Sequence, residues 1–208
     1  MGSWGWVLVG ACAVAIAGLA RHLVLLLGRP YCPEKARPAG SDAQGVLYAF
    51  TWGMLPWAKE STRRHLLAYL RGVVFHIGIG AAFLALLVGP WRAEFAGPLR
   101  WMLVALAAAS GVAGLGGLVV RVAEARLRRL STPDDFFAVA LVSLFTLAAA
   151  AAAVVPALVP AFYGLAAATL IYIPFGKIRH CFYFFFARYF FGAGFGRRGV
   201  LRWGKGHA

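Results

Sequence analysis

Five long apolar segments constrain the fold of this chain more than any other feature. A helix needs about 20 apolar residues to cross the hydrocarbon core of a bilayer. Five segments meet that requirement, namely residues 5–27, 66–89, 99–120, 136–155 and 161–187. The first has no Lys or Arg before it and continues past any small-residue cleavage site, so we expect it to stay in the mature protein. The sequence predicts an all-α integral membrane bundle of five transmembrane helices, forming one membrane domain over residues 1–208.

Composition supports a membrane protein and excludes several other classes. The chain is 62% hydrophobic and 13% charged, whereas a soluble domain is about half apolar and about a quarter charged. This balance excludes a soluble enzyme, a disordered chain and a nucleic-acid-binding domain, although the net charge of +14 alone would suit the last. The three cysteines, Cys12, Cys32 and Cys181, have no disulfide or metal-site spacing.

The positions of Lys and Arg predict the orientation in the membrane. Of the 21 Lys and Arg residues, only Arg92 and Arg100 fall toward one side of the predicted topology. The others fall toward the loop 28–65, the connection between the third and fourth spans, and the tail 188–208. The positive-inside rule makes that side cytoplasmic, with the N-terminus outside a bacterial or archaeal cytoplasmic membrane and the C-terminus inside. Residues 45–64 mix aromatics with cations, so they form either a membrane-surface segment or part of a docking face.

Two of the five histidines lie within predicted spans: His76 in the second and His180 in the fifth. Ionisable residues inside a membrane are functional candidates by default, and the alternative is a neutral histidine bonded to a neighbouring helix. Counted from the cytoplasmic ends of their helices, His76 lies about 14 Å deep and His180 about 11 Å deep. Two imidazoles at similar depth on different helices suit ligation of a haem iron. Zinc is less favoured because no third or fourth ligand is close in sequence.

Glycines and cations surround both histidines in the sequence. Gly72 and Gly80 lie four residues before and after His76, and Gly176 lies four residues before His180. Glycine on the same helix face leaves room for a porphyrin plane, although close helix packing explains it equally well. Nearby cations are either partners for haem propionates or interface cations that reach toward water: Arg21, Arg71, Lys177 and Arg179.

Two further histidines have weaker interpretations. His65 is eleven residues before His76, about three turns nearer the cytoplasm. We expect it to have a surface role, and the alternatives are contact with a propionate or a place along a proton or quinone path. His22 follows Arg21 near the inner end of the first span and has no assigned role.

Three short motifs resemble a known family. Residues 75–79 read FHIGI, residues 109–112 read ASGV with Gly116 and Gly117 following, and residues 174–180 read PFGKIRH. In this order they resemble the second, third and fifth helices of the gamma subunit of respiratory nitrate reductase, a five-helix membrane cytochrome b family. The resemblance extends over about residues 66–188, and it implies that His76 and His180 are the axial ligands of the haem b nearer the cytoplasm.

The chain departs from that family at its second pair of histidines. The corresponding positions are Leu86 and Phe162, which cannot bind iron. The resemblance therefore implies one haem b, and the chain is more similar to related subunits of heterodisulfide-reductase-type complexes.

Together these features predict a haem b electron-transfer subunit. It would carry electrons between the (mena)quinone pool and a cytoplasmic Fe–S oxidoreductase subunit docked on the cationic face. Its residues form no catalytic constellation, so substrate conversion would belong to the partner, and quinone oxidation or reduction by this chain stays open. The alternative is a haem-free membrane anchor or assembly subunit, and a small transporter is disfavoured because no acids pair within the spans.

Overall fold

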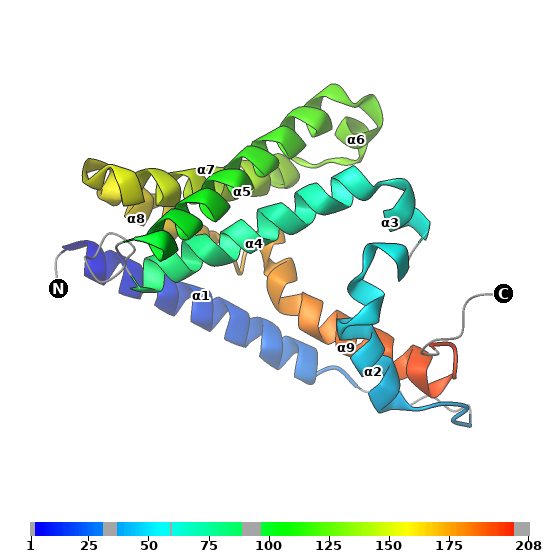
Figure 1. Cartoon of the computed structure of the whole chain (residues 1–208). Helices are drawn as coiled ribbons and strands as arrows, with labels where there is room; N and C mark the ends of the chain where they lie inside the picture. Colours follow the sequence, from blue (N-terminus) through cyan, green and yellow to red (C-terminus); the bar gives the residue numbers. More distant parts are fainter. Residues whose placement is uncertain (1–2, 31–36, 59, 89–96, 202–208) are drawn as a thin grey trace. The chain divides into compact units, whose positions relative to one another are not determined.

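The computed structural model describes residues 3–30, 37–58, 60–88 and 97–201, and all regular structure within them is helical (Figure 1). Four helices are long and apolar enough to cross a membrane: α1 (Ser3–Leu27), α4 (Leu66–Val88), α5 (Pro98–Ala123) and α7 (Pro133–Val154). Their ends lie within three residues of the first four predicted spans. The chain therefore has the helices of a multi-pass membrane protein. Cys32, Arg92 and the tail beyond residue 201 lie outside the described residues.

The fifth predicted span is interrupted. Helix α8 (Val159–Tyr172) ends before Pro174, and a 3₁₀ turn, η5 (Lys177–Arg179), leads into α9 (His180–Arg197). Proline lacks an N–H and clashes with the carbonyl four residues earlier, which explains why α8 stops here. The prediction of one continuous helix over 161–187 is therefore wrong. The pair α8 and α9 counts as a fifth span only if both parts cross together.

The chain divides into two compact units. Unit 1 comprises residues 1–21 and 67–178, and unit 2 comprises residues 22–66 and 179–208. Unit 1 holds α5, α7, α8, the short α6 (Ala125–Leu130) and most of α1 and α4. Unit 2 holds α9 and three-residue 3₁₀ turns, together with α2 (Asp42–Phe50) and α3 (Glu60–Arg64).

The core of unit 1 combines two aromatic rings with many alanines. Helices α5 and α7 run side by side (Figure 1). Phe145 of α7 is fully buried, and its ring stacks on that of Phe162 in α8 with centroids 5.7 Å apart. Six alanines complete the cluster: Ala82, Ala107, Ala149, Ala150, Ala152 and Ala166. Small side chains let helix backbones approach closely, which is the main source of helix association in lipid.

Helix α4 meets α5 at a glycine. A Cβ at Gly78 would overlap the carbonyl oxygen of Leu106 and the side chain of Ser110. Fully buried Ser110 also donates a hydrogen bond to the carbonyl of Phe75, with an oxygen–oxygen distance of 2.7 Å. This contact fixes which face of α4 packs on α5.

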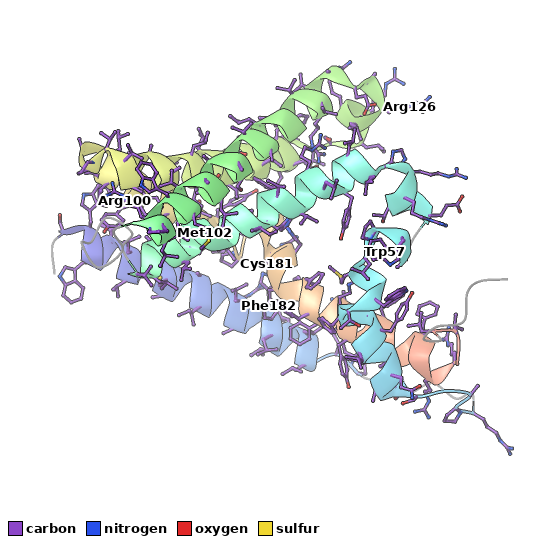
Figure 2. The ribbon with its side chains drawn as sticks, viewed as in Figure 1. Trp57, Arg100, Met102, Arg126, Cys181 and Phe182 are labelled. Carbon is purple, nitrogen blue, oxygen red and sulfur yellow. The ribbon has the colours of Figure 1, made fainter. Side chains whose placement is uncertain are left out.

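The start of α7 is fixed by a capping box and a proline. Thr132 and Asp135 form a capping box, in which the Thr132 N–H donates to Asp135 Oδ2 at 2.8 Å. Pro133 occupies the first helical position, where its missing N–H costs no hydrogen bond. At the other end of α7, Arg100 donates to the carbonyl of Ala153; Figure 2 labels Arg100.

Unit 2 is built on the packing of α2 against α9. A Cβ at Gly45 would overlap the backbone of Gly192 and Gly196. The N–H groups of Ala39 and Gly40 donate to the carbonyl of Arg197 at 2.9 and 3.0 Å. Within the predicted loop 28–65, α2 thus packs on α9, and α9 itself extends into the predicted tail.

Candidate functional site

His76 lies in the middle of α4, with its side chain exposed. Its Nδ1 is 2.7 Å from the carbonyl oxygen of Gly72. A carbonyl only accepts hydrogen bonds, so Nδ1 carries the proton, and in the neutral ring the lone pair is on Nε2. Histidines that bind metals usually donate their other N–H to a carbonyl or carboxylate in this way. The ring of His76 is therefore held in a tautomer that suits iron ligation through Nε2.

The positions of Gly72 and Gly80, on the helix face that carries His76, border open space. A Cβ added at Gly72 or at Gly80 would meet no atom within 4 Å. Residues four apart lie on one face of a helix, so both glycines flank the imidazole. Close packing within this unit does not explain them, in contrast to Gly78. The open face leaves room for a flat group beside the histidine.

Gly176 has a different surrounding from the one the sequence suggested. The space where its Cβ would lie is filled by the ring of Tyr172. That ring also packs edge-on against Phe137, with centroids 4.9 Å apart. The structure thus gives Gly176 a local packing reason at the α8 break.

The four candidate cations have diverse surroundings. Arg71 lies along α5, where its Nε is 3.4 Å from the position of a Cβ at Gly117. It is five residues from His76, about 140° around the helix, so it lies on another face. Lys177 Nζ pairs with Asp135 Oδ2 at 2.6 Å. Arg21 and Arg179 are exposed.

His180 is the first residue of α9 and is exposed. The sequence-based depth of this histidine assumed a continuous helix through residue 187, and the break removes that assumption. His76 belongs to unit 1 and His180 to unit 2, so each is described within its own unit. The similar depth of the two imidazoles stays a prediction.

The other two described histidines belong to unit 2. His22 Nδ1 is 3.0 Å from the hydroxyl of Tyr183, and the rings meet edge-on. This pairing joins residues far apart in the sequence, and no sequence pattern signalled it. His65 is exposed in the turn before α4.

The donor chemistry of His76 and His180 fits a haem. A haem iron needs only two axial ligands from protein, because the porphyrin supplies the other four. Among the residues that the structure describes, no group of three His, Cys, Asp or Glu side chains is arranged to hold a metal. The open face of α4 and the Nδ1–H bond of His76 are compatible with the axial role.

The positions of the family's second histidine pair are part of the apolar core. Phe162 is fully buried against Phe145, and Leu86 packs on the same cluster. Side chains of the protein itself therefore fill the space around Phe162 and Leu86.

The chain was also compared with known proteins. No protein-family model, curated protein or solved structure matches it.

Proposed function

We propose that this chain is the membrane-anchoring haem b subunit of a respiratory oxidoreductase complex, similar to the single-haem relatives of the nitrate reductase gamma subunit. One observation carries the proposal. His76 donates Nδ1–H to the carbonyl of Gly72, and a Cβ added at Gly72 or Gly80, on the same helix face, would meet no atom within 4 Å. The motif FHIGI, which resembles the second helix of the membrane cytochrome b family, contains the same histidine.

His76 and His180 would hold the iron of one haem b, and the bound haem would supply one-electron transfer. Gly72 and Gly80 would leave room for the ring. The carbonyl of Gly72 orients the His76 imidazole, and the apolar helices lower the dielectric around it. The packed core around Phe162 supports one haem rather than two.

Whether the two termini lie on the same side of the membrane depends on whether the number of membrane crossings is even or odd. If α8 and α9 cross as one span, five crossings place the termini on opposite sides. With four crossings, the cationic tail containing Arg188, Arg197 and Arg198 would lie on the same side as the uncharged N-terminal segment. The positive-inside rule favours five, with the tail in the cytoplasm. The cationic surface would then receive a cytoplasmic Fe–S partner, and the quinone pool would exchange electrons from within the membrane.

Reporter fusions test the orientation. Green fluorescent protein fused after residue 208 should fluoresce, whereas alkaline phosphatase at the same place should be inactive, because the first folds in the cytoplasm and the second outside it. The opposite pattern would contradict the inner position of the C-terminus.

A visible spectrum of the purified chain, reduced with dithionite, tests the haem. We expect a b-type α-band that is lost in His76→Ala and in His180→Ala and kept in the control His65→Ala. Gly80→Leu should lower haem content because it fills the open face. Gly116→Leu adds the same side chain at another open position, on α5, and should not. An absent α-band in the parent would favour a haem-free anchor, and an α-band that survives both alanine variants would refute the ligands.

A further inference from the structure

The break between α8 and α9 is held by three contacts within unit 1, which we call the break clamp. The hydroxyl of Tyr172 donates to the carboxylate of Asp134. Lys177 pairs with Asp135 at 2.6 Å. Buried Pro174 packs so closely on α1 that a Cβ at Gly18 would overlap its ring. The two acids belong to the first turn of α7, so α7 and α1 both hold the break.

The acceptor for Lys177 is itself fixed. Asp135 Oδ2 accepts hydrogen bonds from the N–H of Thr132 at 2.8 Å and from its hydroxyl at 3.0 Å. The Asp135 side chain is only 17% exposed. Lys177 therefore pairs with a carboxylate that the capping box of a core helix has already placed. A partner held in advance costs less entropy to engage than two mobile side chains.

Lys177 is three residues before His180. Three residues span at most about 11 Å of extended chain, and the intervening 3₁₀ turn shortens this to about 6 Å. Whatever fixes Lys177 therefore restricts where His180 can lie.

We propose that the break clamp positions His180 as an iron ligand, with Tyr172 and Lys177 as positioning residues; this inference rests on the proposed haem function. Lys177 then acts through Asp135 and not through a haem propionate. The two roles differ in whether the effects of mutating Lys177 and Asp135 depend on each other. The break clamp requires both residues, whereas a contact between Lys177 and a propionate does not involve Asp135.

A double-mutant cycle separates these roles in the full-length, haem-loaded protein. The variants are Asp135→Asn, which keeps an oxygen for the Thr132 cap, Lys177→Met and their combination. Two readouts are measured: the low-spin electron paramagnetic resonance signals of the ferric haem, and the alkylation rate of Cys181. Cys181 is exposed in the first turn of α9 (Figure 2), and Cys12→Ser with Cys32→Ser makes it the single thiol. Glu60→Gln, which breaks the exposed pair of Glu60 with Arg64, is the control.

We expect each single variant to shift the haem signals and to raise the alkylation rate about two- to fivefold. The double variant should be no worse than either single, because the pair is already broken. Glu60→Gln should change neither readout. Additive effects, or haem signals unmoved by Asp135→Asn, would overturn the clamp and favour the propionate role. A parent without haem bands would instead refute the proposed function and the ligand part of this inference, while the Cys181 rates still test whether the clamp holds the break.

Discussion

Gly78 and Gly80 lie two residues apart in α4, and the structure gives them opposite tolerance to a side chain. In Gly78→Ala the new Cβ overlaps the Leu106 carbonyl and Ser110, so α4 must move away from α5. Such overpacking costs about 1–3 kcal/mol, and loss of the Ser110 hydrogen bond adds about 0.6 kcal/mol. Replacing glycine by alanine in a helix returns about 1 kcal/mol. The net loss of unfolding free energy is about 0.6–2.6 kcal/mol.

Gly80→Ala should raise the unfolding free energy rather than lower it, because the new Cβ would meet no atom within 4 Å. It keeps the gain in helix propensity of about 1 kcal/mol. For a chain of this size, each kcal/mol moves Tm by about 2–4 °C. In thermal unfolding of the haem-free protein in detergent, Gly78→Ala should therefore lower Tm by about 1–10 °C, and Gly80→Ala should leave Tm unchanged or raise it. Gly116→Ala, at an equally open position on α5, serves as the control. Equal losses at Gly78 and Gly80 would refute the assignment of the two faces of α4.

Two further variants test the cores of the two units. Phe145→Ala removes a fully buried ring that contacts Phe83 and Phe162, and it should lower the unfolding free energy by about 3–5 kcal/mol; a loss below 1 kcal/mol in denaturant titration would contradict this core. In unit 2, a Cβ at Gly192 would lie 2.6 Å from the Cα of Val46, so Gly192→Ala should separate α2 from α9. Faster hydrogen exchange over residues 42–50, with exchange in α7 unchanged, is the expected result, and unchanged exchange in α2 would count against the glycine contact.

The sequence predicted the long helices because their signals are local. Length and apolarity identify a span, whereas the Thr132–Asp135 capping box starts α7 three residues before the predicted span. The break at Pro174 was missed because the apolar run continues on both sides of it. Proline is tolerated in membrane helices where neighbours support the freed backbone. Here Pro174 interrupts the helix and packs closely on Gly18 of α1, a tertiary contact that hydropathy cannot indicate.

In the candidate site, too, contacts within one helix could be predicted from the sequence and contacts between helices could not. The carbonyl four residues before His76 is a local partner, so the helix itself provides the Nδ1–H bond. The role of glycine was not predictable, because Gly72 faces open space, Gly78 faces a helix and Gly176 faces Tyr172. The partners of Arg71 and Lys177 depend on α5 and α7, which proximity in sequence does not reveal.

The two proposed ligands differ in what holds them. His76 takes its orientation from its own helix, through the carbonyl of Gly72. His180 follows a break whose neighbouring residues are tied to α7 through Asp134 and Asp135. A change at the first turn of α7 should therefore reach His180 and leave His76 undisturbed. If both histidines bind one iron, the first turn of α7 would influence that iron through His180, although no residue of this turn is itself proposed as a ligand.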